Sequence, residues 1–342
     1  MTKEIALYSG WGVEKDTRNP GDYLCHLGAV SLLANYGITD LVDIRHSHEP
    51  ITEPWKHPLI IGGGTVLPTV FEHWVGPGLR CSSDIYIFGS GMLSPEELRK
   101  KGIDRIDLEP YRRSRVIGLR GPLSVKHYQD LFNVSATYIG DLAFAFAQNN
   151  TIVDKIGPIT FFYIENNYPS SRIMGTQKHI FEAYRYILTS STDVHDVDSK
   201  IIMTDNHELP AMADIVPYTG ISKLNDAFTL VDVVAKSSII VTERLHPAII
   251  AACYGIPFLY LQTTSKSLDL QGLLNSFGTN FNMLFYDMNS RYEDLGERFR
   301  SILQNDEFPH QLTEVSLSIK RQLESAAERL SQIIKSESIS LD

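Results

Sequence analysis

The chain has 342 residues, 43% of them hydrophobic and 21% charged, which is enough for about two globular domains with buried cores. Its formal net charge of −10 argues against a general binder of nucleic acids or anionic membranes, because such proteins usually carry a basic excess. No apolar run approaches the roughly 20 residues of a membrane helix, and the first residues lead directly into a strand-like segment. We therefore expect a cytoplasmic protein with at most peripheral membrane contact.

The cysteines and histidines do not form a metal-binding pattern. Three cysteines are far apart in the sequence: Cys25, Cys81 and Cys253. Two short pairs lack further ligands at a suitable spacing: His46 with His48, and Asp205 with His207. This spacing is not typical of a disulfide framework or a zinc knuckle, so we expect buried thiols, no structural metal and no cofactor.

Short apolar runs rich in β-formers alternate with helical patterns along the chain. In the first half the predicted strands are Ile5–Tyr8, Leu59–Ile61, Ile85–Phe88 and Val116–Leu119, and a helix begins at about Asp22. In the second half the predicted strands are Ile159–Ile164, Lys200–Thr204, Ile215–Val216, Ser238–Val241 and Phe258–Leu261, with helices near Gln177–Thr189, Asp226–Ser237 and Leu268–Phe277. Such alternation predicts an α/β protein with two Rossmann-like, doubly wound domains.

The domain boundary is predicted at a polar group, 148–150, which follows the last apolar segment of the first half. We expect an N-terminal domain at 1–150 and a C-terminal domain at 151–310. Leucines and isoleucines recur at helical spacing from Gln311 to Lys335. The remaining residues, 311–342, are therefore predicted to form a helix that closes the two domains.

The most informative segment, Thr242–Pro247, follows a predicted strand and opens an apolar helical segment. Arg244 and His246 are thus expected where open α/β sheets bind their ligands. The guanidinium can bind a carboxylate or phosphate, the N–H groups of the helix start add positive potential, and the imidazole can move a proton. Lys266 opens the next helix and could reach a phosphate there, although lysines in loops are usually only solvated. The segment predicts a site for a small anion.

Two turns of the first half allow both a structural and a functional interpretation. Asn19 and Asp22 precede the first helix, where Asp22 can cap the helix or accept a proton from a hydroxyl group of a bound acceptor. Gly62, Gly63 and Gly64 follow a predicted strand and allow backbone amides to approach a ligand closely. Glycines also occur in such turns only to bend the chain. The triplet is neither a Walker A loop nor a dinucleotide fingerprint.

Two further turns carry a charged residue after a predicted strand. Arg120 is followed by Pro122, which suits the first turn of a helix, and we favour ligand contact over a surface ion pair for this arginine. Asp141 follows Gly140, and we expect it to cap a helix or orient an arginine.

In this order the motifs resemble those of the polysaccharide pyruvyl transferases. The resemblance extends from about Asn19 to Leu274 and rests on Asn19-Pro20-Gly21-Asp22, Gly62-Gly63-Gly64, Arg120 with Ser124, Gly140-Asp141, Arg244-Leu245-His246 and Lys266. In much of the family an aspartate follows the first arginine, whereas Gly121-Pro122 follows it here. This variant is similar to the branch that acts on bacterial exopolysaccharide and capsule repeats.

The resemblance implies a fold like that of GT-B glycosyltransferases, with two Rossmann-like domains facing across a cleft. It also implies phosphoenolpyruvate as donor and, as acceptor, a sugar of a lipid-linked oligosaccharide or polymer, which becomes a pyruvate ketal. The implied roles are phosphoenolpyruvate binding by Arg120, Ser124, Arg244 and Lys266, proton donation by His246, acceptor-side base catalysis by Asp22, and acceptor contacts by Asn19, Gly62, Gly63, Gly64 and Asp141.

Two other functions fit the same pattern. A GT-B glycosyltransferase that uses a nucleotide sugar would share the fold, although Glu243 is the only nearby carboxylate in the second half that could hold a ribose. A non-catalytic sensor of sugars or anions would keep the arginines and would not require His246.

Overall fold

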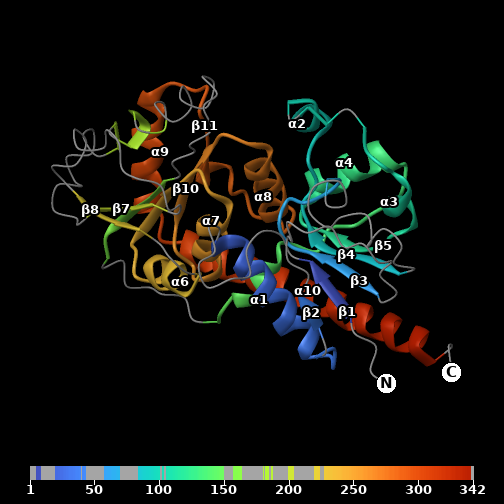
Figure 1. Cartoon of the computed structure of the whole chain (residues 1–342). Helices are drawn as coiled ribbons and strands as arrows, with labels where there is room; N and C mark the ends of the chain where they lie inside the picture. The colour runs from blue at the N-terminus through green and yellow to red at the C-terminus, as the bar shows by residue number, and fades with distance from the viewer. Residues whose placement is uncertain are drawn as a thin grey trace. The chain divides into compact units, whose positions relative to one another are not determined.

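The computed structural model describes residues 5–8, 20–39, 41–43, 58–69, 84–100, 102–103, 105–149, 157–163, 180, 182–184, 186–187, 199–203, 219–223 and 227–339. It divides into two compact units (Figure 1). Unit 1 comprises Met1–Thr17, Asp22–Phe146 and Ser318–Asp342, and unit 2 comprises Arg18–Gly21 and Ala147–Leu317. Several predicted features lie outside the described residues: Asn19, Cys81, the strand Ile215–Val216, and both histidine-containing pairs.

Unit 1 is built on a parallel sheet of five strands in the order β2-β1-β3-β4-β5. The strands are β1 (Ile5–Tyr8), β2 (Leu41–Asp43), β3 (Leu59–Gly62), β4 (Ile85–Ser90) and β5 (Arg115–Leu119). Its helices are α1 (Pro20–Ala34), α2 (Pro95–Lys100), α3 (Glu109–Arg113), α4 (Pro122–Phe132) and the 3₁₀ helix η3 (Leu142–Phe146). Strands β1, β3 and β4 are buried along their whole length, as in a parallel sheet covered on both faces. The four strands predicted here are confirmed.

Unit 2 is built on a parallel sheet of six strands in the order β11-β10-β9-β6-β7-β8. The strands are β6 (Ile159–Tyr163), β7 (Ser199–Met203), β8 (Thr219–Lys223), β9 (Ile239–Thr242), β10 (Phe258–Gln262) and β11 (Phe285–Asp287). Its helices are α6 (Ala227–Ala235), α7 (Leu245–Cys253), α8 (Ser265–Asn275), the 3₁₀ helix η6 (Asn282–Leu284) and α9 (Tyr292–Gln304). The predicted helix near 177–189 is helical at 180, 182–184 and 186–187, the positions that are described.

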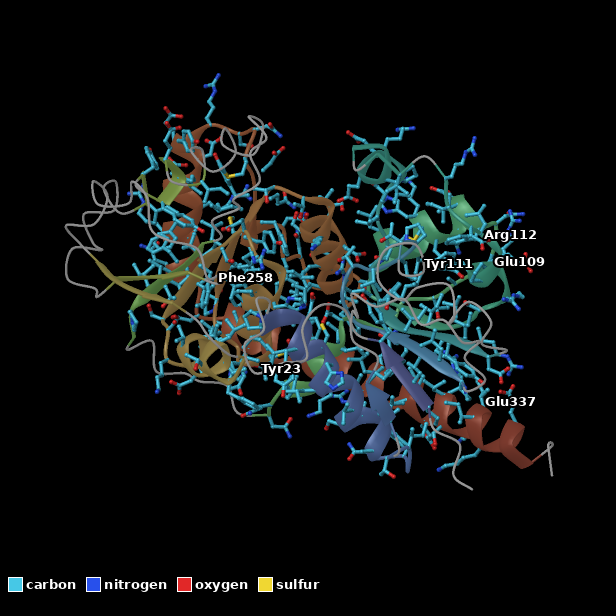
Figure 2. The ribbon with its side chains drawn as sticks, viewed as in Figure 1. Tyr23, Glu109, Tyr111, Arg112, Phe258 and Glu337 are labelled. Carbon is cyan, nitrogen blue, oxygen red and sulfur yellow. The ribbon has the colours of Figure 1, made fainter. Side chains whose placement is uncertain are left out.

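The C-terminal helix α10 (Phe308–Ile339) is a single helix of 32 residues, which confirms the helical prediction for this segment. Its residues before Ser318 belong to unit 2 and the rest to unit 1. Within unit 1, Ser331 Oγ donates to the carbonyl of Tyr36 at 2.8 Å and Gln322 Nε2 donates to that of Tyr138 at 2.7 Å. Glu337, labelled in Figure 2, pairs with Arg115. None of the described helices combines the length and the apolar character needed to span a bilayer.

Both sheets contain a point at which the strand order reverses. In unit 1 the chain moves from β1 to one side at β2 and then to the other side at β3, so the reversal lies between β1 and β3. In unit 2 it lies between β6 and β9. Ligands of open parallel sheets bind outside the carboxyl ends of the strands at such a reversal. The topology therefore directs attention to the residues that follow β1, β3, β6 and β9.

Helix α1 packs closely on η3 within unit 1. A Cβ atom at Gly28 would lie 2.2 Å from the carbonyl oxygen of Leu142. This is far inside van der Waals contact, and the opposing atom belongs to the backbone, so it cannot move aside as a flexible side chain could. Close approach of the two elements thus requires glycine at this position.

We predict that Gly28→Ala destabilises the protein, although alanine is the better helix former by about 1 kcal/mol. The clash with Leu142 should outweigh this gain and lower the free energy of unfolding by about 1–3 kcal/mol. Urea unfolding measures the difference. Ser31→Ala, an exposed position in the same helix, is the control and should change stability by less than about 0.5 kcal/mol. Equal stability of Gly28→Ala and wild type would contradict this packing.

Candidate functional site

The turn that follows β9 lies at the strand reversal of unit 2. Thr242 is the last residue of β9, and Arg244 is the residue before α7, with extended backbone angles of φ −98° and ψ 139°. The backbone N–H of Arg244 donates to Thr242 Oγ1 at 2.8 Å, which closes the turn. Arg244 therefore sits at the N-terminal end of α7, where the helix dipole attracts anions.

Helix α7 is fixed in its orientation by burial. Every residue of this helix except His246 is buried, so the helix cannot rotate without exposing apolar surface. The imidazole of His246 lies against Gly21, which is grouped with unit 2, and a Cβ atom at Gly21 would lie 1.9 Å from His246 Nδ1. The absence of a side chain at Gly21 therefore leaves the space that the imidazole occupies.

Lys266 is brought to the same edge of the sheet as Arg244 and His246. It is the second residue of α8, which follows β10, and β10 pairs directly with β9. Thr264, the residue before α8, has an extended backbone, and its carbonyl accepts a hydrogen bond from Ser267 Oγ at 2.7 Å. Since neighbouring strands lie about 4.8 Å apart, the turns after β9 and β10 are neighbours. Unit 2 thus gathers three of the predicted residues at two adjacent helix N-termini.

A buried tyrosine ties the two strands at this reversal together. The hydroxyl of Tyr184 lies 2.7 Å from the carbonyl oxygen of Phe162 in β6 and 2.8 Å from Glu243 Oε2, which directly follows β9. One hydroxyl proton serves both acceptors, so the carboxylate is held beside the end of β6. Sequence reasoning missed this tyrosine, because it is separated from Glu243 by 59 positions and no local pattern links the two residues.

In unit 1, Arg120 is a buried residue with 4% exposure, so the alternative of a surface ion pair is wrong. Its Nη1 donates to Thr65 Oγ1 at 2.7 Å, and its backbone N–H donates to the carbonyl of Ser90 at 3.0 Å. A Cβ atom at Gly91 would lie 2.6 Å from the Arg120 Cζ, so the guanidinium rests directly on this glycine. The side chain is held beyond the carboxyl ends of β3 and β4, and it keeps its charge at any physiological pH.

The glycine turn after β3 adopts a conformation that other residues rarely reach. Gly63 and Gly64 have φ angles of 76° and 61°, both in the left-handed region. The next turn holds them in place, because Gly91 N–H donates to the carbonyl of Gly64 at 2.7 Å and Ser90 Oγ donates to that of Gly63 at 3.1 Å. Ser124, in the first turn of α4, accepts a hydrogen bond from the backbone N–H of Met92 at 3.1 Å.

Asp141 and Cys25 connect η3, α1 and the glycine turn. Asp141 Oδ1 accepts from the backbone N–H of Ala143 at 3.0 Å, which confirms the predicted capping role. The same atom accepts from Cys25 Sγ at 3.1 Å, and the backbone N–H of Gly64 donates to that sulfur. Burial, followed by the charges of Asp141 and Asp22, raises the pKa of the Cys25 thiol. It therefore stays protonated and can donate while it accepts.

Asp22 does not cap α1, which corrects one of its two predicted roles. The helix begins two residues earlier, at Pro20, so Asp22 lies inside the first turn. Its carboxylate there interacts favourably with the helix dipole. Asp22 is partly buried at this position.

Replacement of Cys25 tests whether the thiol fixes the glycine turn. We predict that Cys25→Ala leaves the N–H of Gly64 without its acceptor and lowers the free energy of unfolding by about 1–3 kcal/mol. Cys25→Ser keeps a donor and an acceptor and should recover part of this loss. Thermal unfolding compares the two variants. If they are equally destabilised, the loss comes from packing alone and the hydrogen bonds contribute nothing.

Comparison with known proteins identifies the fold and the family. The chain is similar to a putative UDP-N-acetylglucosamine 2-epimerase from Listeria monocytogenes, with 13% identity, a TM-score of 0.55, and coverage of 99% of this chain and 97% of that chain. It is also similar to the alpha,alpha-trehalose 6-phosphate synthase from Burkholderia multivorans, with 11% identity, a TM-score of 0.54 and coverage of 100% and 98%. At these identities the similarity establishes only the fold, an α/β fold of two Rossmann-like domains as in GT-B proteins.

No curated protein sequence matches the chain significantly. The family model for polysaccharide pyruvyl transferase matches residues 19–265, which include every motif described above except Lys266. Since this match extends over most of the sequence, the chain belongs to the polysaccharide pyruvyl transferase family.

Proposed function

We propose that this transferase takes its pyruvyl group from phosphoenolpyruvate and joins it to two hydroxyls of one sugar as a cyclic ketal, releasing phosphate. The observation that carries the proposal is the grouping of Arg244, His246 and Lys266 at adjacent helix N-termini in unit 2. Two cationic residues and the N-terminal ends of two helices suit a small donor that carries both a carboxylate and a phosphate.

The reaction needs one proton at carbon and two oxygen nucleophiles. Protonation of the methylene carbon of phosphoenolpyruvate produces a methyl group and a cationic centre at C2, which the first sugar hydroxyl attacks and thereby loses its proton. The C2–O bond to phosphate then breaks, and a second hydroxyl of the same sugar adds to C2 and also loses a proton. One of the two released protons balances the first step and the other leaves with phosphate or a base.

His246 is the proposed acid for the carbon protonation. Its imidazole is partly exposed and held against Gly21, and it is the one side chain of α7 that is not buried. Arg244 lies two positions earlier in the chain, at the start of the same helix, so an anionic donor bound there would lie close to the proposed acid.

The acceptor is assigned to unit 1, with Asp22 as the base that receives the hydroxyl proton. A sugar of a lipid-linked oligosaccharide or of a bacterial exopolysaccharide or capsule precursor is the proposed class. Asn19, Gly62, Gly63, Gly64 and Asp141 remain predicted acceptor-side residues. Arg120 and Ser124 remain predicted donor contacts, and the buried guanidinium of Arg120 is a permanent charge held on Gly91 and Thr65.

The nucleotide-sugar alternative receives less support from the residues of unit 2. It depended on Glu243 as the carboxylate that holds a ribose. One oxygen of this carboxylate accepts a hydrogen bond from Tyr184. The interaction holds Glu243 at the end of β6, where it serves the structure of the turn.

Loss of the Arg244 guanidinium should weaken donor binding. A hydrogen bond to a charged group contributes about 1.5–3 kcal/mol, so Arg244→Ala is predicted to raise the Kd for phosphoenolpyruvate by roughly 10- to 100-fold. Isothermal titration calorimetry measures this directly. Arg300→Ala removes an exposed cation from α9 of the same unit and should leave the Kd unchanged. An unchanged Kd in Arg244→Ala would refute the donor site.

Replacement of His246 should separate binding from turnover. His246→Gln keeps a polar side chain that cannot supply the proton, so we predict that kcat falls by roughly 100- to 10,000-fold while phosphoenolpyruvate still binds. Phosphate release with a panel of aryl glycosides of common hexoses provides the rate, and calorimetry provides the affinity. Near-normal turnover of His246→Gln would show that another group donates the proton. Retained binding and retained biological function without turnover would favour a sensor.

A further inference from the structure

The strand reversal of unit 1 contains a buried hydroxyl that the reaction described above does not use. Tyr8 is the last residue of β1 and is paired with Ile61 of β3, so it lies at the carboxyl end of the two strands between which the order reverses. Its side chain is completely buried, and its hydroxyl has no hydrogen-bond partner among the residues that the structure describes.

Two other tyrosines in the same hydrophobic cluster have buried hydroxyls that are hydrogen-bonded within the protein. Tyr111, on α3 and labelled in Figure 2, donates to the carbonyl of Pro68. Tyr128, on α4, donates to the carbonyl of Tyr111 at 2.9 Å. Both are as completely buried as Tyr8, and both are satisfied by backbone carbonyls. Tyr8 is the exception within a cluster that otherwise pairs its phenols.

An unpaired buried hydroxyl is costly, at about 1–3 kcal/mol, and phenylalanine would fill the same space without this cost. Such groups in native proteins call for a physical reason, of which a bound ligand is one. The location of Tyr8 agrees with that reason, because the carboxyl ends of strands at an order reversal are where open parallel sheets bind ligands.

The surroundings indicate the chemistry of the ligand. Burial raises the pKa of Tyr8, and the negative charge of Asp22 raises it further, so the phenol remains protonated and acts as a donor. Asp22 is in the first turn of α1, the helix that follows β1, and offers a carboxylate as acceptor. A hydrogen-bond donor, the phenol, near a hydrogen-bond acceptor, the carboxylate, complements the hydroxyl groups of a neutral sugar. The negative charge of Asp22 disfavours an anionic ligand at this point.

We propose that the Tyr8 hydroxyl is a hydrogen-bond donor to a sugar oxygen of the acceptor, which makes Tyr8 an acceptor-binding residue of unit 1. The identification of the ligand as a sugar rests on the proposed function. The donor site in unit 2 does not involve this residue. The unpaired hydroxyl of Tyr8 lowers the stability of the free protein, and it gains a hydrogen-bond partner only when the acceptor is bound.

Tyr8→Phe tests the proposal through the melting temperature and the acceptor KM. Loss of a hydroxyl with a purely structural role would change these two quantities differently from loss of a ligand contact. We expect the melting temperature of the free protein to stay the same or rise, because an unpaired polar group is removed. The KM for the aryl glycoside acceptor should rise roughly 3- to 10-fold, with phosphoenolpyruvate affinity unchanged. Tyr128→Phe is the matched control and should lower the melting temperature while leaving the acceptor KM unchanged.

Three results would overturn the inference. A melting temperature that falls in Tyr8→Phe as it does in Tyr128→Phe would show that the hydroxyl has a partner within the protein. An unchanged acceptor KM would show that the Tyr8 hydroxyl does not contact the acceptor. A loss of phosphoenolpyruvate affinity would show that Tyr8 contacts the donor instead.

Saturation-transfer NMR without phosphoenolpyruvate measures direct binding of the same glycosides and separates this inference from the proposed function. If wild type releases no phosphate from phosphoenolpyruvate, the proposed donor chemistry fails. A glycoside that binds wild type and binds Tyr8→Phe more weakly would still support the acceptor contact. Equal binding to both proteins, or binding to neither, would contradict it.

Discussion

In a parallel sheet every strand ends at the same edge, and this constraint gathers the chemically capable residues of unit 2. Residues that follow β9 and β10 come together because these two strands are neighbours, although Arg244 and Lys266 are distant in sequence. The reversal of strand order between β6 and β9 adds the helix N-terminus of α7 at the same place. The positive potential there follows from the topology as much as from the side chains.

Buried packing and hydrogen bonds hold the residues at the ends of these strands in place. Helix α7 is buried on all sides apart from His246, and the Tyr184 hydroxyl connects the ends of β6 and β9 through Phe162 and Glu243. Unit 1 uses a comparable arrangement, in which Arg120 rests on Gly91 and donates to Thr65. Charges held in advance in a low-dielectric surrounding stabilise opposite charge without reorganisation, which suits the anionic donor proposed above.

Local sequence patterns predicted the parts of the structure that local physics controls. Strand β9 was predictable because a strand buried on both faces needs a continuous apolar run, and α4 because Pro122 fits the first position of a helix. The same preference explains the error at Asp22, since Pro20 occupies the start of α1. Strand β8, Thr219–Lys223, lacks an apolar run and was missed. Contacts such as Cys25 with Asp141, 116 positions apart, depend on tertiary packing and leave no local signal.

The central claim is that unit 2 binds phosphoenolpyruvate and that the family membership of the chain extends to this donor. Thermal unfolding of the wild-type protein with phosphoenolpyruvate, compared with UDP-N-acetylglucosamine and GDP-mannose, tests it most directly. A ligand present at about 100 times its Kd adds about 2.7 kcal/mol of stability, which is a readily measured shift. We predict stabilisation by phosphoenolpyruvate alone. Stabilisation by a nucleotide sugar without any response to phosphoenolpyruvate would contradict the account and favour a glycosyltransferase.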